Sequence, residues 1–480
     1  MKTPVAILFC LAAAAFALPA WPHISLPLGS RWLEHLNKEL LPFWSTESAF
    51  GNPFGAFPTT RCDDGTLYNR ERPCPELRSN PWISPHQRHL VALSRQVYGY
   101  GVAFHLTGDR AHLNAMKAGI NFIRQNAIDR VNGGLAVTQN TLDGSWGPAP
   151  QQRSSQELAY GILGLAFYYY LTRDTDVLQD ILVIKNYIFT QYYSTRLGIM
   201  QMYPQSNQVA NTKNKQLGAQ LDQMNAFMQL LTPLLSGPLQ RQWKDDLLLL
   251  CNAMLNEFYS PDDHLFFLTV GEPEDRKLTT AGTDFGHNAK ALWMIRWTGL
   301  ITGRADLVAF AEESARALFR QAFQDDCGCW ADGFSRGGAL DVNKTWWIYA
   351  ELDQLAGTLA LHDSALTKYL SRAYEYWFSH FIDNAHGEVW NGVDGSGTPV
   401  RHLPKQWSWK NAYHSFEHAL VGYIVTQQLA GKRVTLYYAF GDTPVGFVQP
   451  YYFSGTVQAA ESEIDNHGHS VQKISFGNIH

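Results

Sequence analysis

Two kinds of hydrophobic pattern alternate along this chain, and both have the period of an α-helix. The segment from Ala305 to Phe323 carries its apolar side chains on one stripe, as expected for a helix with one face in solvent. The segment from Gly286 to Gly303 is apolar almost all the way round, which is typical of a helix buried on two faces. The alternation predicts an inner and an outer layer of helices.

We predict twelve helices, which are separated by connectors rich in Gly and Asp. They cover residues 31–45, 87–106, 111–127, 154–172, 175–193, 217–235, 238–257, 286–303, 305–323, 344–361, 364–382 and 412–430. The helices that are apolar on all sides begin near residues 87, 154, 217, 286, 344 and 412, so a unit of two helices repeats six times. Six such pairs predict an all-α fold, an (α/α)6 barrel.

Most connectors that lead into the inner helices contain a short apolar run bounded by Gly and Asp. Residues 132–146, NGGLAVTQNTLDGSW, and residues 329–341, CWADGFSRGGALD, are two examples, and both predict small β-hairpins. The hairpins would gather at one mouth of the barrel, beside the N-terminal ends of the inner helices. We expect the pocket at this mouth. It would also be lined by helix N-termini, whose free N–H groups favour negative charge.

The two ends of the chain differ from the repeats. Residues 1–20 predict a signal peptide, with an apolar run after Lys2 and cleavage after Ala17 or Ala20, so we expect a secreted or periplasmic protein. Residues 21–431 would form the barrel domain, and residues 432–480 a short β extension. In that extension RVTLYYAF and VQPYYFSG predict two strands, followed by a loosely ordered tail that carries His residues.

Export would make disulfides possible, and five cysteines follow the predicted signal. Cys62 and Cys74 lie in one polar loop and could pair. The odd number leaves at least one free thiol, most simply Cys251 in an apolar helix, and no cysteine spacing indicates a zinc site.

Charge and composition narrow the range of partners. The net charge of the 480 residues is −5 and no block of Lys or Arg stands out, so we do not expect nucleic acid binding. After the signal, no apolar run reaches the ~18 residues of a membrane span. The 15 Trp and 22 Tyr residues are compatible with a sugar-binding cleft. The sequence allows a homodimer.

Two histidines occupy equivalent places in the repeat. His287 opens the fourth inner helix and His414 opens the sixth, while Arg95 lies on the first. The six-fold frame would bring these residues to one pocket, although a single His at a helix end is more often structural. A neutral His can act as a base near pH 7 and Arg can stabilise an enediolate oxygen, so the set suits proton abstraction beside a carbonyl.

The sixth inner helix also contains the spacing H-x-x-E-H, formed by His414, Glu417 and His418. This is the spacing of an inverzincin zinc peptidase, which needs a third ligand on a later helix. The 62 residues after His418 predict strands and a tail, so we favour a site without metal, with His418 as a structural residue.

Four segments carry a resemblance to a known family: RHLVALSRQVYGYG, TDFGHNAKALWMI, KTWWIYAEL and WKNAYHSFEHAL. With these motifs the chain, from about Trp32 to Ala430, resembles the N-acylglucosamine 2-epimerase superfamily. That superfamily includes cellobiose 2-epimerases and mannose and sulfoquinovose aldose–ketose isomerases. The resemblance implies a mono- or oligosaccharide substrate and a reaction without cofactor or metal.

The resemblance also implies roles for individual residues. His287 and His414 would be the general acid/base pair at C2 of a ring-opened sugar, and Arg95 would bind its carbonyl end. The residues expected around the sugar are Tyr98, Asp222, Asn225, Lys290, Lys344, Trp347, Glu351, Trp409 and Glu417. Within this set Trp347 and Trp409 would form walls, and Lys344 and Glu351 would organise the fifth inner helix.

The chain departs from the family pattern at three places. Many relatives have Glu where this chain has Lys290, and commonly Arg where it has Glu417. We hypothesise a reversed ion pair between these two residues, and expect Lys290 to favour the neutral form of His287. Cellobiose epimerases carry another His on the third inner helix, where this chain offers Asp222 and Asn225 among its polar residues.

Two other classes of function remain open from the sequence. Glycoside hydrolases and polysaccharide lyases also use helical barrels, and a hydrolase could draw its two carboxylates from Asp222, Asp284 and Glu351. The changed Glu and Arg positions would also fit a sugar-binding relative without activity.

Overall fold

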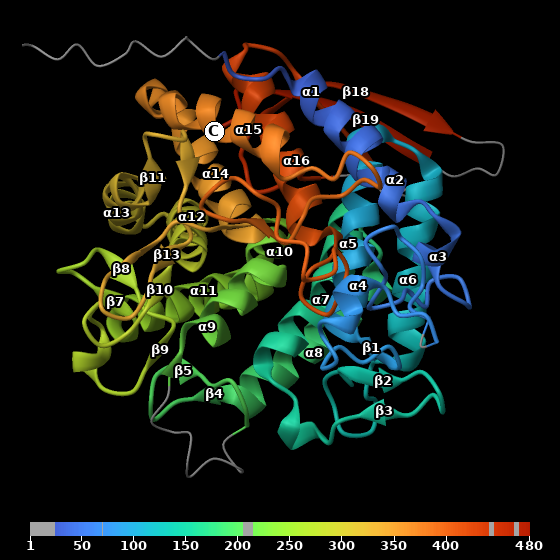
Figure 1. Ribbon diagram of the computed structural model, residues 1–480. Helices are drawn as coiled ribbons and strands as arrows, with labels where there is room; N and C mark the ends of the chain where they lie inside the picture. Colours follow the sequence, from blue (N-terminus) through green and yellow to red (C-terminus); the bar gives the residue numbers. More distant parts are fainter. Residues whose placement is uncertain (1–24, 70, 205–214, 441–445, 465–469) are drawn as a thin grey trace, which may run out of the picture.

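Two concentric layers of helices form the body of the molecule (Figure 1). The computed structural model describes residues 25–69, 71–204, 215–440, 446–464 and 470–480. The inner helices are α5 (Leu90–Thr107), α7 (Ser155–Thr172), α9 (Leu217–Gln223) with η4 (Met224–Met228) and α10 (Gln229–Leu231), α12 (Phe285–Thr302), α14 (Trp346–Ala360) and α16 (Ala412–Leu429). The outer helices are α6 (Arg110–Asn126), α8 (Thr175–Tyr192), α11 (Gly237–Glu257), α13 (Ala305–Ala322), α15 (Thr367–His380) and the continuous run α1 (Gly29–Glu34), η1 (His35–Leu40) and α2 (Leu41–Trp44).

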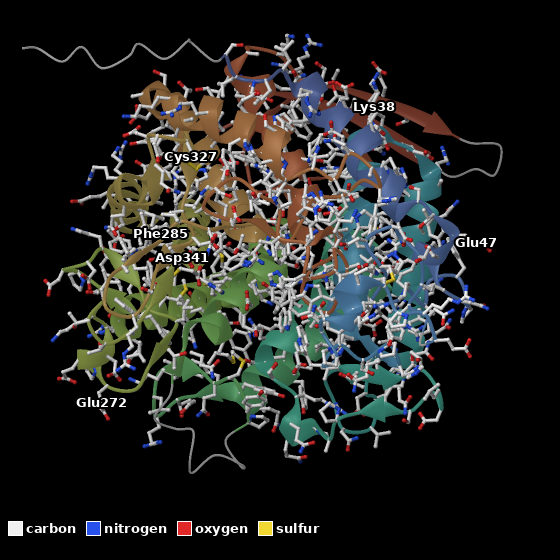
Figure 2. All side chains as sticks on the ribbon, viewed as in Figure 1. Lys38, Glu47, Glu272, Phe285, Cys327 and Asp341 are labelled. Carbon is white, nitrogen blue, oxygen red and sulfur yellow. A yellow bond between two sulfur atoms is a disulfide. The ribbon has the colours of Figure 1, made fainter. Side chains whose placement is uncertain are left out.

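The inner helices form a closed ring, because each packs on the next and α16 packs on α5. They are buried on all sides, and α16 is buried at every residue from Ala412 to Thr426. The outer helix α13 instead buries one stripe, which includes Leu307 and Leu318. Figure 2 shows the side chains of these helices as sticks, which crowd the centre of the view. The predicted (α/α)6 barrel is confirmed. Within the described residues, no helix combines the length and apolarity needed to cross a membrane.

Short antiparallel strands occupy the connectors, as the Gly- and Asp-bounded runs predict. They are β1 (Gln87–His89), β2 (Thr138–Asn140), β3 (Trp146–Gly147), β4 (Tyr193–Ser194), β5 (Ile199–Met200), β6 (Lys215–Gln216), β7 (Tyr259–Ser260), β8 (Leu265–Phe266), β9 (Thr269–Val270), β10 (Thr283–Asp284), β11 (Phe323–Gln324), β12 (Cys329–Trp330), β13 (Gly333–Phe334), β14 (Leu340–Asp341), β15 (Lys344–Thr345) and β16 (Gly392–Val393). Several end where an inner helix begins: β1 precedes α5, β6 precedes α9, β10 precedes α12 and β15 precedes α14.

Short helical turns complete the described helical elements. They are α3 (Glu47–Phe50), α4 (Pro75–Arg78), η2 (Pro150–Gln152), η5 (Thr232–Leu234), η6 (Pro273–Asp275) and η7 (Ser364–Leu366). Two of them, η5 and η7, fall within the predicted helices 217–235 and 364–382. The helical pattern also places the start of two inner helices two or three residues too early. Residues 87–89 and 344–345 are strands, because they pair with β2 and β16, and Lys344 therefore precedes α14 rather than opening it.

The C-terminal extension differs from its prediction. β17 (Val434–Tyr438), β18 (Thr456–Ile464) and β19 (Ser470–Gly477) form an antiparallel sheet in the order β17-β19-β18, drawn in red in Figure 1. The expected strand at VQPYYFSG is wrong, because Tyr451 and Tyr452 turn into the barrel and are buried there. The expected loose tail is also wrong, since β19 buries apolar side chains and pairs on both edges.

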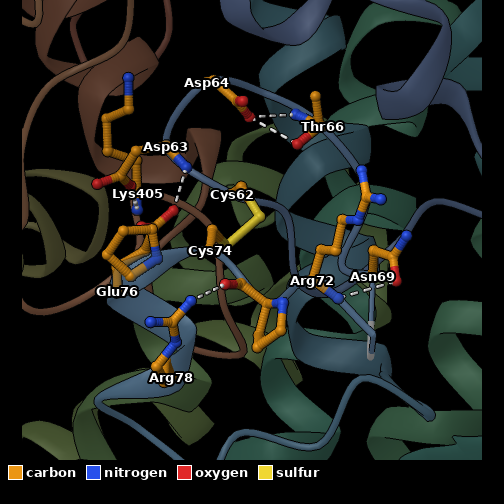
Figure 3. The surroundings of a disulfide bond; sticks show 12 residues. Cys62, Asp63, Asp64, Thr66, Asn69, Arg72, Cys74, Glu76, Arg78 and Lys405 are labelled. Atoms are coloured by element: carbon orange, nitrogen blue, oxygen red, sulfur yellow. Dashed lines mark hydrogen bonds between the residues drawn. A yellow bond between two sulfur atoms is a disulfide. The ribbon is translucent and has the colours of Figure 1, made fainter.

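Four of the cysteines in the described residues form two disulfides, and one is free. Cys62 and Cys74 form a disulfide (Figure 3), and Cys251 is the buried free thiol. A second disulfide joins Cys327 and Cys329, a pairing that the sequence analysis did not single out. The first 24 residues, with the predicted signal peptide, lie outside the described residues, as do His467 and His469 of the tail.

Candidate active site

A cavity of about 280 Å³ opens among the inner helices. The residues that line it are Arg95, Gln156, Tyr160, His287, Lys290, Trp346, Trp347, Trp409 and His414. They come from α5, α7, α12, α14 and α16, together with the loop before α16. Residues far apart in the sequence therefore meet by their position in the repeat, as the six-fold frame predicts.

His287 is held in place by the residue that caps its own helix. Asp284, at the N-cap of α12, accepts hydrogen bonds from the backbone N–H of His287 and from its Nδ1, both at 2.7 Å. The imidazole also packs edge-on against Trp347, with 4.7 Å between ring centroids. Burial opposes a charge on this ring, but the Asp284 carboxylate more than offsets it and raises the pKa of His287. The expected effect of Lys290 acts in the other direction and is outweighed.

The surroundings of His414 shift its pKa in the opposite direction to that of His287. It is 5% exposed, and its Nδ1 lies 3.5 Å from Oε1 of Glu351 and 3.7 Å from Oε2 of Glu417. Burial, followed by the positive charges of Lys290 and Arg95, holds the pKa of His414 well below its usual range. The two imidazoles of one cavity are therefore driven apart in pKa, a pattern that separates an acid from a base.

Arg95 supplies a positive charge to the cavity without a carboxylate partner. Its Nη1 donates a hydrogen bond to the carbonyl of Trp409 at 3.0 Å, and its guanidinium lies 3.9 Å from the ring centroid of Tyr160. Its Nε is buried and unpaired, and within the described residues no carboxylate oxygen lies within 4.0 Å of it. A buried guanidinium with free donors suits the oxygen of a substrate.

Lys290, which lines the cavity, connects it to two carboxylates buried behind its wall. Lys290 Nζ is 3.4 Å from Oε1 of Glu351 and 3.9 Å from Oδ1 of Asp222. Asp222 also accepts hydrogen bonds from Tyr160 Oη and Gln156 Nε2, both at 2.7 Å. The hypothesised ion pair between Lys290 and Glu417 is not formed, because Lys290 binds these other two carboxylates.

Glu417 instead accepts a hydrogen bond from Tyr451 Oη at 2.5 Å. Burial and the nearby Glu351 raise the pKa of Glu417 to about 8. A carboxyl in this state is largely uncharged near neutral pH, which explains why it needs no cationic partner.

Of the predicted residues, six line the cavity: Arg95, His287, Lys290, Trp347, Trp409 and His414. The other six do not: Tyr98, Asp222, Asn225, Lys344, Glu351 and Glu417. Asn225 and Tyr98 lie in the layer behind, where they bond the hydroxyls of Tyr413 and Tyr451. Lys344 is turned away from the cavity and donates to the carbonyl of Val342, because its strand precedes the helix.

Three lining residues were not among the predicted site residues. Gln156 and Tyr160 lie four residues apart at the start of α7, on one face of that helix, and Trp346 is the first residue of α14. The position of α7 in the repeat was a usable signal for the first two, since its first turns occupy the same place as those of α12 and α16.

The carboxyl cluster does not fit a divalent cation. Ligand atoms of Glu351, His414 and Glu417 lie within 4.8 Å of one another, close enough to share an ion. The Lys290 ammonium, however, already lies 3.4 Å from Glu351 and would repel a metal. His418 is absent from this group and pairs with Asp353 at 2.9 Å, so the H-x-x-E-H spacing does not form an inverzincin site.

The chain is similar to carbohydrate epimerases in sequence and in fold. Residues 75–417 match the family model described as N-acylglucosamine 2-epimerase (GlcNAc 2-epimerase). A cellobiose 2-epimerase of Dictyoglomus turgidum is 22% identical over 410 residues, which cover 81% of this chain and 96% of that protein. The solved structure of a cellobiose 2-epimerase from Bacillus thermoamylovorans has a TM-score of 0.68 at 16% identity and covers 83% of this chain and 99% of its own. A D-mannose isomerase structure has a TM-score of 0.66 at 16% identity, with 85% and 99% covered. These two structures share the fold of this chain.

Proposed function

The chain belongs to the N-acylglucosamine 2-epimerase family, and from this premise we propose that it epimerises or isomerises a sugar by proton transfer at C2. The observation that carries the proposal is that His287 and His414 line one cavity together with Arg95. Their pKa values are shifted in opposite directions, upward for His287 and downward for His414. The pair therefore offers a proton donor and a proton acceptor at the same pH.

In the proposed reaction, neutral His414 takes the proton from C2 of the ring-opened sugar. The electron pair of the broken C–H bond forms a double bond between C1 and C2, and negative charge develops on O1. Arg95 and protonated His287 stabilise this charge by hydrogen bonding. Donation of a proton by His287 to the opposite face of C2 re-forms the C1 carbonyl and gives the epimer. Return of the proton to C1, together with transfer of the O2 hydroxyl proton to O1, forms a carbonyl at C2 and gives the ketose. The steps use only groups of this chain and the substrate.

Aromatic side chains would hold the sugar. Trp347 lies between the two imidazoles, 4.7 Å from His287 and 6.0 Å from His414 between ring centroids. Trp409 lines the cavity and is 38% exposed, so it can contact a further sugar outside. The site thus suits a monosaccharide or the reducing end of an oligosaccharide.

The lining of the cavity gives less support to carbohydrate cleavage. A hydrolase needs two carboxyl groups that face the scissile bond, and no carboxylate is among the lining residues. Asp284 is engaged by His287, while Asp222 and Glu351 are buried behind Lys290. None of the three carboxylates considered from the sequence is free to act in this way.

We also propose that the protein is exported. Two disulfides within the described residues fit an oxidising compartment. The signal predicted over residues 1–20 would direct it there. N-terminal sequencing of the protein from culture medium or periplasm would test this, and a retained N-terminus in the cytoplasmic fraction would contradict it.

Incubation with a panel of free aldoses and ketoses in D2O tests the proposed function. We expect deuterium at C2 or C1 of at least one sugar, because the abstracted proton exchanges with solvent. His287→Gln and His414→Gln should each lower the exchange rate by about 100- to 10,000-fold while sugar binding persists. Exchange at an undiminished rate in both variants would refute the assignment of the two histidines.

A further inference from the structure

A row of three tryptophans leads outward from the active cavity. Trp409 lines that cavity, and Trp407 precedes it by two residues in the segment before α16. Trp82, from a distant connector, packs edge-on against Trp407, with 5.3 Å between ring centroids. Two residues of chain span at most about 7 Å, so Trp407 lies near the mouth of the cavity. We call these three residues the aromatic path.

Both ends of the aromatic path face solvent. Among the tryptophans of the described residues, only Trp82, at 60%, and Trp409 are exposed. A large apolar ring is unfavourable in water, and exposed Trp is characteristic of binding surfaces. That both exposed tryptophans belong to one path from the cavity indicates a ligand which extends out of it.

Buried polar contacts hold the path in place. Lys410, next to Trp409, pairs with Glu388 at 2.7 Å, and both side chains are fully buried. The indole N–H of Trp407 donates a hydrogen bond to Oδ1 of Asn391 at 3.0 Å. A surface that is already ordered loses little conformational entropy when a ligand binds. The path is therefore a rigid support and not a loose loop.

A second cavity, of about 550 Å³, begins where the path ends. Ser84, two residues after Trp82, lines it. None of the described residues that line this cavity is Asp, Glu, Lys or Arg. Its polar side chains include Ser84, His86, Gln87, His89, Thr138 and Asn140. The cavity thus offers uncharged donors and acceptors of hydrogen bonds.

The pairing of β1 with β2 gathers these side chains on one face. Gln87 is paired with Asn140, and His89 with Thr138. Cross-strand partners point to the same side of a sheet, and so do residues two apart along a strand. Burial lowers the pKa of His89, so its ring adds no charge near pH 7.

The two cavities are neighbours at one mouth of the barrel. β1 leads directly into α5 (Figure 1), and His89 is the last residue before that helix. Arg95, which lines the active cavity, follows six residues later. At a rise of 1.5 Å per residue this separation is about 9 Å along the helix axis. A single extended ligand can therefore contact both cavities.

We propose that the second cavity and Trp82 form an accessory saccharide-binding site. Indole faces suit the C–H faces of sugars, and uncharged donors and acceptors suit their hydroxyls. The ligand is a neutral oligosaccharide, whose reducing end enters the active cavity while further units lie along the aromatic path and against β1 and β2. Turnover of that reducing end rests on the proposed function, whereas binding at the accessory site does not.

Trp82→Ala is the central variant, because this side chain is mostly in solvent and its loss leaves the core intact. Phe54→Ala is the matched control. Phe54 is 53% exposed and packs on Phe50 at 5.4 Å, yet it lines neither cavity. Gln87→Ala tests the polar face, again at an exposed side chain.

Calorimetric titration measures binding. The probes are glucose and mannose, together with β-1,4-linked glucose, α-1,4-linked glucose and β-1,4-linked mannose oligosaccharides of two to six units. In the wild type, Kd should fall as at least one series lengthens. For its longest member we expect Kd to rise about tenfold in Trp82→Ala and about fivefold in Gln87→Ala. Phe54→Ala should bind as the wild type does.

Deuterium exchange in D2O gives the kinetic readout. We expect kcat/KM of the wild type to increase with chain length in the series that binds. Trp82→Ala should lower kcat/KM about tenfold for the longest oligosaccharide and leave that for the monosaccharide unchanged. A variant that harmed the fold or the active cavity would lower both values.

A Kd that does not depend on chain length in any series, or equal binding by Trp82→Ala and Phe54→Ala, would overturn the accessory site. Deuterium exchange on the monosaccharide would then still support the proposed function. Conversely, oligosaccharide binding that Trp82→Ala weakens, in a protein that exchanges deuterium into no sugar, would retain the accessory site and refute the proposed function.

Discussion

The carboxylate of Asp284 binds His287 twice, through the backbone N–H and through Nδ1, and both distances are 2.7 Å. One side chain thus begins helix α12 and orients the imidazole that lies one turn inside it. The same residue raises the pKa of His287. Local helix capping and the electrostatics of the site are therefore two effects of a single carboxylate.

Asp284→Asn separates these two effects. Asn caps a helix as well as Asp does, so the fold should hold, but the neutral amide removes the charge that favours imidazolium. The pKa of His287 should fall, and an activity that requires protonated His287 should be lost at lower pH than in the wild type. The dependence of kcat/KM on pH measures this alkaline limb.

Asp284→Ala is the control for the cap. It removes both the charge and the hydrogen bond to the helix, so it should show the same shift and also lose about 1 kcal/mol of stability. An alkaline limb that stays in place in Asp284→Asn would contradict the role given to this carboxylate.

Lys290→Met should destabilise the protein strongly. The ammonium of Lys290 is the cation shared by Glu351 and Asp222, and all three side chains are buried. Removing it leaves buried carboxylates without compensation, which costs about 3–5 kcal/mol. Urea denaturation measures the free energy of unfolding.

Lys344→Met is the comparison, because that buried ammonium bonds a single carbonyl and its removal should cost clearly less. Equal losses in the two variants would argue against a special role for the carboxylates.

The contribution of Glu417 to the stability of the wild type should fall as pH rises from about 4.5 to about 8. Its pKa in the folded protein is raised to about 8, so across this range the folded state holds a proton that the unfolded state has released. Glu417→Gln cannot ionise, and its Tm should vary less over the same range. Thermal unfolding from pH 5 to pH 8 compares the two proteins, and parallel curves would show that Glu417 ionises normally.

Loss of the Cys62–Cys74 disulfide should weaken sugar binding as well as stability. The bridged loop holds the segment before α16, since Asp63 accepts from the backbone N–H of Lys405 at 2.7 Å (Figure 3). That segment leads to Trp409 at the mouth of the cavity. We expect the double change to Ser to cost about 2–4 kcal/mol and to raise KM more than it lowers kcat. Tm with and without reductant and steady-state kinetics measure both effects.

Cys251→Ala is the control for the disulfide. Cys251 is a buried free thiol remote in sequence from the loop, so we expect reductant to lower the Tm of this variant as much as that of the wild type. A KM that is unchanged in the disulfide variant would show that Trp409 is held by other contacts.

The C-terminal extension shows where a local pattern misleads. VQPYYFSG has the aromatic content of a strand, yet Tyr451 and Tyr452 bind partners on inner helices, namely Glu417 and the carbonyl of Asn225. Such partners lie tens to hundreds of residues away in the sequence. A local pattern cannot register them, whereas the position of α7 in the repeat does indicate Gln156 and Tyr160.

The sequence by itself determined the twelve-helix repeat, because the period of apolar residues and the spacing of Gly and Asp act locally and recur six times. It also determined that His287, His414 and Arg95 share a cavity, since equal positions in a closed repeat must converge. Only the tertiary structure decided which of the charged and polar groups around these three residues pair with one another. Lys290 pairs with Glu351 and Asp222 instead of Glu417, and Tyr451 takes Glu417, because the partners of a buried charge are set by atoms within a few ångströms and not by order along the chain.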